Sequence, residues 1–147
     1  MKKALVICSL ALAVSSANAA DFRTSVPLNV EESKPNSEVY TMGLSPFAIS
    51  IIHKKNIAPN FKTAIERELS KQEKGGYATQ VTQKSYNKEH YQAVEFTRNT
   101  QYGNLYYFIY QAKDKPNINA IMLQTNKRIE PESNKAFKEY RNIINNL

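Results

Sequence analysis

Two consecutive segments, LYYFIYQA at Leu105–Ala112 and INAIMLQT at Ile118–Thr125, decide the fold of this 147-residue chain. Both segments are rich in β-branched or aromatic residues, so each is predicted to be a strand. Successive side chains of a strand point to opposite faces, and here both faces carry apolar or aromatic residues instead of alternating with polar ones. We therefore expect both faces of the sheet to be covered by other elements.

Two further strands are predicted upstream of this pair, over Tyr77–Lys84 and Tyr91–Arg98. The links between the four segments are short and rich in turn-forming residues, at 87–90, 99–104 and 113–117. Links of this length join antiparallel neighbours, so the four segments are predicted to form a meander.

Two amphipathic helices flank this meander in the sequence. Asn60 can cap the first helix, and Gly75-Gly76 can end it. The second helix begins near Pro131, whose fixed φ is tolerated in a first turn. Their apolar stripes are Phe61, Ala64, Ile65 and Leu69 in the first helix, and Ala136, Phe137, Tyr140, Ile144 and Leu147 in the second.

A hairpin is predicted upstream of the first helix, from strands at Glu38–Met42 and Phe47–His53. Residues 20–37 contain two prolines and no sustained period, and are predicted to be a loosely ordered lead-in with a short strand at 25–30. One α+β domain at 38–147 is therefore expected, with a mostly antiparallel sheet made of the hairpin and the meander. One helix on each face would give an α/β/α sandwich. Both helices on one face would instead leave an aromatic face open for binding.

The order of hairpin, helix, meander and final helix resembles the PsbP, Mog1 and DcrB group of small α/β/α domains. The segments that carry the resemblance are Phe47–Ile52, Phe61–Leu69, Tyr91–Phe96 and Phe137–Leu147. Bacteria often export domains of this group, and its members are typically accessory or adaptor proteins. The resemblance therefore implies a non-enzymatic role.

Residues 1–19 have the pattern of a cleavable signal peptide. Lys2 and Lys3 precede an apolar run, and Ala17-Asn18-Ala19 is a small-residue cleavage site. A periplasmic or secreted protein is expected, without a transmembrane segment. The single cysteine, Cys8, lies within the leader, so disulfides and thiolate chemistry are not expected in the exported chain.

The charge of the chain favours anionic partners only mildly. The formal net charge is +7, of which Lys2 and Lys3 account for two units, leaving +5 on the exported chain. Such a surplus suits an acidic protein or an anionic envelope component, but solubility explains it equally well. Nucleic-acid binding is not expected, because the chain has neither a known motif nor a concentrated basic run.

Catalytic and cofactor motifs are not found in the sequence. His53 and His90 are the only histidines, and neither has a partner at metal-ligand spacing, so both are interpreted as solvated loop residues. Gly43-Leu44-Ser45-Pro46 lacks the second glycine of a nucleophile turn. Four glycines in the whole chain leave no phosphate-binding loop. We expect no enzyme, no metal and no cofactor.

Candidate binding residues are aromatic side chains in turns and one basic cluster. Tyr86 and Tyr102 are placed in meander turns, where a tyrosine has less core to explain it. His53-Lys54-Lys55 at a strand end could hold an anion.

The sequence therefore predicts an exported, non-enzymatic binding or accessory protein of the bacterial cell envelope, which engages a protein or an envelope component through the meander turns. A periplasmic inhibitor or immunity protein that acts on an enzyme is one alternative. A small-ligand carrier and a metal-independent hydrolase that uses one histidine are the others. The oligomeric state is not determined by the sequence.

Overall fold

The structure, a computed structural model, describes residues 29–42, 49–74 and 80–147. The predicted signal peptide at 1–19, the first two residues of the strand predicted from Phe47, and Gly75-Gly76 lie outside the described residues. The described chain forms one seven-stranded sheet with two helices, which confirms the α+β class.

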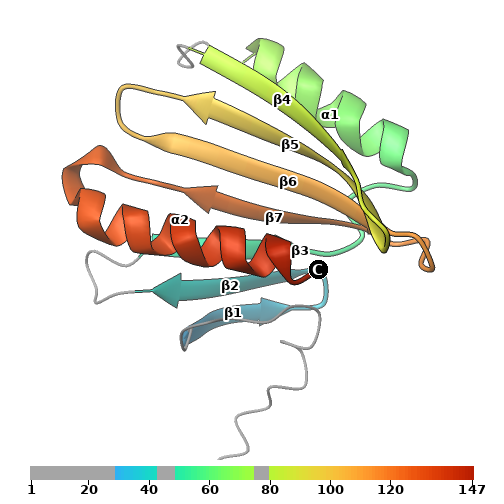
Figure 1. Ribbon diagram of the computed structural model, residues 1–147, viewed down its shortest axis with the longest axis horizontal. Helices are drawn as coiled ribbons and strands as arrows, with labels where there is room; N and C mark the ends of the chain where they lie inside the picture. The colour runs from blue at the N-terminus through green and yellow to red at the C-terminus, as the bar shows by residue number, and fades with distance from the viewer. Residues whose placement is uncertain (1–28, 43–48, 75–79) are drawn as a thin grey trace, which may run out of the picture.

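The sheet runs in the order β1-β2-β3-β7-β6-β5-β4, and all neighbouring strands are antiparallel (Figure 1). The strands are β1 (Asn29–Lys34), β2 (Ser37–Met42), β3 (Ile49–Lys54), β4 (Gln80–Asn87), β5 (Tyr91–Asn99), β6 (Asn104–Ala112) and β7 (Ile118–Gln124). The predicted hairpin is β2 with β3, and the predicted meander is β4 to β7.

Two strand boundaries differ from the prediction. Residues 29–34 form β1, an edge strand paired with β2 around the turn at Pro35-Asn36, where a loosely ordered lead-in was expected. β4 extends to Asn87, three residues beyond the expected end at Lys84. The end of β4 is polar and resembles a turn, but backbone hydrogen bonds to β5 hold it in the sheet whatever its side chains are.

The hairpin joins the meander through its last strand. β3 pairs with β7, with Ile51 opposite Leu123 and His53 opposite Ile121. Because β7 lies beside β6, the hairpin strands are brought close to β6, although more than fifty residues of sequence separate them. This pairing positions the candidate site described below.

The helices are α1 (Phe61–Lys74) and α2 (Glu130–Asn145), the second entered through a short 3₁₀ turn at Lys127–Ile129. The backbone N–H of Thr63 donates to Asn60 Oδ1 at 2.9 Å, which confirms the predicted cap of α1. Pro131 lies in the first turn of α2, as expected. Among the described residues, neither helix is long and apolar enough to cross a membrane.

The two helices cover opposite faces of the sheet, which makes the molecule an α/β/α sandwich (Figure 1). On one face, α2 packs on β3, β5, β6 and β7 through Tyr140, Ile143 and Ile144. On the other face, α1 packs through Ala64, Phe61 and Ile65 on Val94 and neighbouring side chains of the meander. Neither face is left as an open aromatic surface over the meander core, so the sequence alternative with both helices on one side is wrong.

Candidate functional site

A cavity of about 670 Å³ lies at one end of the sheet. It is bordered by the β4–β5 turn, the β6–β7 turn, the segment between β3 and α1, and the end of α2. Most of the residues that line it are polar or charged: three lysines, three asparagines, two tyrosines, one histidine, Glu89 and Asp114. The volume falls in the range of small-ligand pockets, about 300–1,000 Å³.

Backbone hydrogen bonds hold three of the four segments around this cavity, all but the end of α2. The N–H of Lys113 donates to the His90 carbonyl at 2.9 Å, which ties the two meander turns together. The N–H of Ile57 donates to the Ile118 carbonyl at 2.9 Å, which ties the segment before α1 to the start of β7. Backbone hydrogen bonds therefore hold these parts of the cavity wall in place.

Asparagine side chains shape the wall beside β7. Asn56 has a positive φ of 52°, a conformation that asparagine tolerates better than most residues. Its backbone N–H donates to Asn119 Oδ1 at 3.2 Å, and the Asn117 amide donates to Asn56 Oδ1. These three amides line the cavity, and they present both donors and acceptors.

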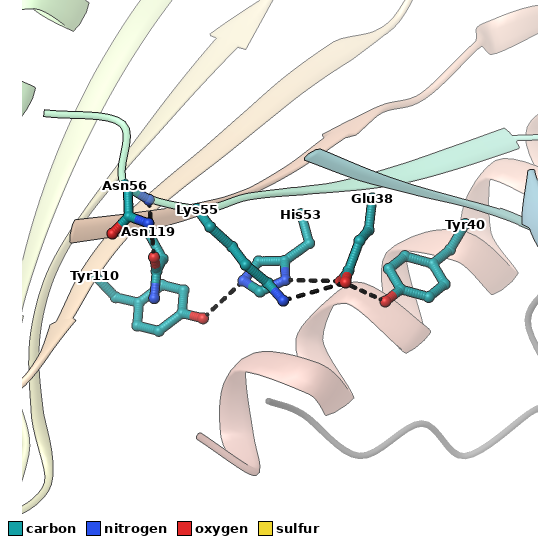
Figure 2. A network of polar contacts seen from close by, with 7 residues as sticks. All are labelled: Glu38, Tyr40, His53, Lys55, Asn56, Tyr110 and Asn119. Carbon is teal, nitrogen blue, oxygen red and sulfur yellow. Dashed lines mark hydrogen bonds and ion pairs between the residues drawn. The ribbon is translucent and has the colours of Figure 1, made fainter. Parts of the chain in front are cut away.

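A buried chain of polar side chains lies beneath the cavity, on the α2 face of the sheet. Figure 2 shows Tyr40, Glu38, His53 and Tyr110 in one row, with Lys55 reaching the Glu38 carboxylate. Glu38 Oε2 accepts from the Tyr40 hydroxyl at 2.7 Å and lies 3.4 Å from His53 Nδ1. His53 Nε2 lies 3.0 Å from the Tyr110 hydroxyl, and Lys55 Nζ donates to Glu38 Oε1 at 3.1 Å. Tyr110 and Lys55 also line the cavity, so the chain connects the sheet interior to it.

Strand alternation places these residues on one face. Glu38 lies opposite His53 in the β2–β3 pair, and Tyr40 lies opposite Ile51. Tyr110 lies two positions beyond Phe108, which shares the α2 face. Three different strands therefore converge on one polar cluster within an otherwise apolar layer.

Electrostatics favour the ionised form of Glu38. Burial alone would raise the pKa of its carboxyl, but hydrogen bonds from Tyr40, Lys55 and His53 outweigh burial and hold the pKa below its ordinary value. A carboxylate accepts hydrogen bonds and cannot donate, so His53 directs its Nδ1–H at Glu38. In the neutral ring Nε2 then has no hydrogen, and the Tyr110 hydroxyl donates to it.

The predicted basic cluster His53-Lys54-Lys55 is divided between the two faces of the sheet. His53 is 0 % exposed and lies on the α2 face, so its interpretation as a solvated loop residue is wrong. Lys54 points to the opposite face, where it lines a smaller cavity of about 220 Å³ beside α1. Lys55 returns to the α2 face and pairs with Glu38. Adjacent strand residues alternate, and the sequence prediction treated the three as one surface.

Tyr86 lies within β4, so the prediction that placed it in a meander turn is wrong. Its ring is half-buried against Phe108, with centroids 5.6 Å apart, and its hydroxyl donates to Glu95 Oε1 at 3.4 Å. Glu95 also accepts two hydrogen bonds from Arg141 and one from Tyr140, so this cluster fastens α2 to the sheet. Tyr86 therefore contributes to the attachment of α2 to the sheet through Glu95.

Tyr102 and His90 lie where the sequence placed them, in solvated turns. Tyr102 is 63 % exposed in the β5–β6 turn, at the end of the sheet opposite the cavity. The His90 side chain is 76 % exposed and borders the cavity beside Glu89.

Three residues of the polar chain, Glu38, Tyr40 and Tyr110, are not among the sequence candidates. A signal for Glu38 exists: it falls on the same face as Tyr40 in a strand whose alternation directs that face to the core. His53 likewise continues the period of Ile49 and Ile51. A charged residue and a histidine on the apolar side of two paired strands would have indicated a buried polar pair.

Among the residues that the structure describes, no cluster of three metal-ligating side chains is present. No protein-family model matches the chain, and no curated protein matches it. A solved structure of a protein of unknown function from Pseudomonas aeruginosa, PA94, is similar at 13% sequence identity and a TM-score of 0.48, with 76% of this chain and 83% of that chain covered.

Proposed function

We propose that this protein is an exported, non-enzymatic binding or accessory module of the bacterial cell envelope, and that it holds its protein partner at the cavity between the β4–β5 and β6–β7 turns. The observation that carries the proposal is the cavity of about 670 Å³ itself, which the meander turns border and which is lined mostly by polar and charged residues. Its amides and ammonium groups are hydrogen-bonding groups suited to a polar or acidic segment of a partner.

The burial of His53 favours binding over chemistry at this site. Its ring is 0 % exposed, and Glu38 and Tyr110 contact its two nitrogens. A general base has to reach the proton that it removes from a substrate, directly or through one water. The hydrolase that uses one histidine is therefore less well supported than a binding module.

The rim of the cavity carries charges of both signs. Lys113 and Lys115 are exposed in the β6–β7 turn, and Lys55 lies deeper in the cavity. Glu89 and Asp114 also border the rim, so the surface is mixed in sign and gives directional recognition instead of general attraction to anions.

In-cell photo-crosslinking tests the proposal. A photo-reactive amino acid is placed at Lys115 in the full-length tagged protein in its own host, and captured proteins are identified by mass spectrometry. Two matched positions serve as controls: exposed Lys135 on α2, and Tyr102 in the opposite meander turn.

We expect one dominant partner from Lys115 and none from Lys135. Crosslinking from Tyr102 alone would move the binding surface to the opposite end of the sheet and contradict the assignment to the cavity. Folded protein without any crosslinked protein at either turn would contradict the binding-module proposal.

A further inference from the structure

A second cavity, of about 220 Å³, lies on the face of the sheet that α1 covers. It is bordered by the end of β3, the segment that leads from β3 into α1, α1 itself and β6, and we call it the α1-side cavity. Its polar and charged lining residues are Lys54, Arg67, Glu68, Lys71 and Tyr107. The cavity is smaller than the pockets of about 300–1,000 Å³ that hold drug-sized ligands, so it suits a small polar group.

Tyr107 brings a hydroxyl to this cavity. Tyr107 is 8 % exposed, so more than nine-tenths of the residue is buried. Within residues 29–42, 49–74 and 80–147, its hydroxyl has no hydrogen-bond partner, and the one fully enclosed side-chain polar atom without a partner there is Arg98 Nε. The Tyr107 hydroxyl is therefore not fully enclosed, and it opens onto the cavity that Tyr107 lines. A largely buried hydroxyl without a partner costs free energy, so this position favours a ligand that hydrogen-bonds to it.

The Tyr107 hydroxyl keeps its proton at neutral pH. Burial is the first cause and the negative charge of Glu68 the second, and together they raise the pKa of Tyr107 to about 12. A protonated hydroxyl can donate a hydrogen bond, so Tyr107 can donate to an oxygen of an anionic ligand.

The side chains around the α1-side cavity carry a surplus of positive charge. Lys54, Arg67 and Lys71 are positive, and Glu68 is the one negative residue in the lining. Arg98, which is not part of the lining, pairs with Glu68, with its Nη2 atom 3.4 Å from Glu68 Oε1. Among the described residues, neither the Lys54 nor the Lys71 ammonium has an ion-pair partner. The cavity therefore offers uncompensated positive charge to an anion.

Secondary structure directs these groups to one place. On α1, Ala64, Arg67, Glu68 and Lys71 follow the spacing i, i+3, i+4 and i+7, which puts them on one face of the helix. Arg67 Nη1 donates to the Ile57 carbonyl at 3.1 Å, which holds the guanidinium beside the cavity. A guanidinium has five N–H donors, so Arg67 keeps further donors for a ligand.

We propose that the α1-side cavity binds a phosphate group, which Lys54, Arg67 and Lys71 attract and to which Tyr107 donates a hydrogen bond. The donors come from three elements, β3, α1 and β6, so they approach the cavity from different directions. A tetrahedral phosphate has oxygens that point in several directions, whereas a planar carboxylate has two. Arginine and lysine are the residues that proteins use most for phosphate recognition.

The apolar part of the lining strengthens this attraction. Ala64 and Ile57 line the same cavity as the charged groups. Both belong to the apolar layer between α1 and the sheet. Walls of low dielectric constant focus the field of nearby charges and raise the local concentration of a counter-ion.

This inference goes beyond the proposed function. The α1-side cavity and the cavity assigned to a protein partner share no lining residue. Crosslinking from Lys115 therefore tests the partner, and phosphate binding tests the α1-side cavity. The failure of one experiment leaves the other proposal standing.

Inorganic phosphate is the probe for the first measurement. Sodium phosphate is titrated into the full chain purified from its own host, and backbone amide signals are followed by NMR, with sodium chloride at equal ionic strength as the reference. We expect saturable shifts at residues 54–57, 67–71 and 107 that chloride does not produce. Shifts that chloride reproduces, shifts confined to residues 113–115 of the other cavity, or the absence of saturable shifts would overturn the inference.

Two tyrosine variants test the hydroxyl. Tyr107→Phe removes only the oxygen that faces the α1-side cavity, and Tyr91→Phe removes a hydroxyl from the other cavity. We expect phosphate affinity to fall about tenfold in Tyr107→Phe and to stay within about twofold of wild type in Tyr91→Phe. Because the Tyr107 hydroxyl has no partner within the described chain, Tyr107→Phe should keep the Tm of wild type in the absence of phosphate. Unchanged phosphate affinity in Tyr107→Phe would contradict the role of this hydroxyl.

Lysine variants test the charge. Lys54→Met removes a positive charge from the α1-side cavity, Lys54→Arg keeps it, and Lys115→Met removes a charge from the other cavity. We expect about tenfold weaker phosphate binding in Lys54→Met alone. Lys71→Ala, at an exposed position, should also weaken binding and keeps the test available if Lys54→Met does not fold. Equal losses in Lys54→Met and Lys115→Met would show general attraction to a basic surface and overturn the site.

Glycerol 3-phosphate separates two sources of the phosphate group. Tighter binding of this ester than of inorganic phosphate, with the same loss in Tyr107→Phe, supports a small phosphomonoester as the ligand. Equal or weaker binding of the ester supports free phosphate. Binding of the ester that is insensitive to both Tyr107→Phe and Lys54→Met would contradict the assignment to the α1-side cavity.

Discussion

A carboxylate and an imidazole in an apolar layer have to satisfy each other. Glu38 is 3 % exposed, and its two oxygens accept from Tyr40 and Lys55 and face His53. Each unsatisfied polar group at such depth would cost about 1–3 kcal/mol, more for a charged one. The cluster therefore couples β2, β3 and β6 as well as connecting them to the cavity.

Glu38 should make part of the stability of the protein sensitive to acid. Its pKa is lower in the folded protein than its ordinary value of 4.5, so around that pH the unfolded chain binds more protons than the folded one. The stabilisation is present above about pH 4.5 and is lost as pH falls through the folded pKa. Glu38→Gln should therefore cost roughly 1–3 kcal/mol near pH 7 and less at acidic pH.

Urea unfolding at neutral and acidic pH measures this difference. Glu66→Gln is the matched control, because Glu66 is exposed and pairs only weakly with Lys62 at 3.8 Å. Its cost should stay within about 0.5 kcal/mol at both pH values. A cost of Glu38→Gln that grows towards acidic pH would show that this carboxylate is not stabilised in the way described.

The two helices begin where their local sequence predicts, because capping residues and first-turn residues determine a helix start. The first helix begins where Asn60 can accept a backbone hydrogen bond, and the structure places that bond at Thr63 N–H. The second begins at Glu130, and its first turn contains Pro131, which that position tolerates. The edge strands are predicted less well from their local sequence. β1 and the end of β4 have weak strand patterns, and pairing with a neighbouring strand holds them in the sheet.

Asn60→Ala should destabilise the protein by about 1 kcal/mol, because a donor in the first turn of α1 loses its acceptor. Asn60→Asp keeps an acceptor at the same position and should stay close to wild type. Thermal or urea unfolding of the two variants measures this contrast. Equal losses in both variants would mean that the amide group of Asn60 contributes by something other than the cap.

At the scale of the whole molecule, side chains on both faces of the central strands contribute to the free energy of unfolding. Phe96 packs in the α1 layer and Phe108 in the α2 layer, and both are almost fully buried. Phe96→Ala and Phe108→Ala should each cost about 3–5 kcal/mol in the free energy of unfolding. If one face of the sheet were open to solvent, one of these two substitutions would leave the free energy of unfolding nearly unchanged.

Leu69→Ala is the control for this pair, because Leu69 is an exposed apolar residue of α1. Its cost should stay within about 0.5 kcal/mol. Denaturant unfolding with circular dichroism measures all three variants. A small loss for either phenylalanine would contradict the two-layer packing.

The sequence by itself determined the α+β class, six of the seven strands, both helices and the antiparallel meander, because periodicity, caps and short links are local properties. It indicated Tyr102 and His90 as exposed turn residues for the same reason. Only the tertiary structure decided that β3 pairs with β7 and that the two helices take opposite faces. Those choices bring His53 within 3.0 Å of Tyr110, 57 residues away. Pairing between distant segments depends on the burial gained by the whole sheet, which no local pattern encodes.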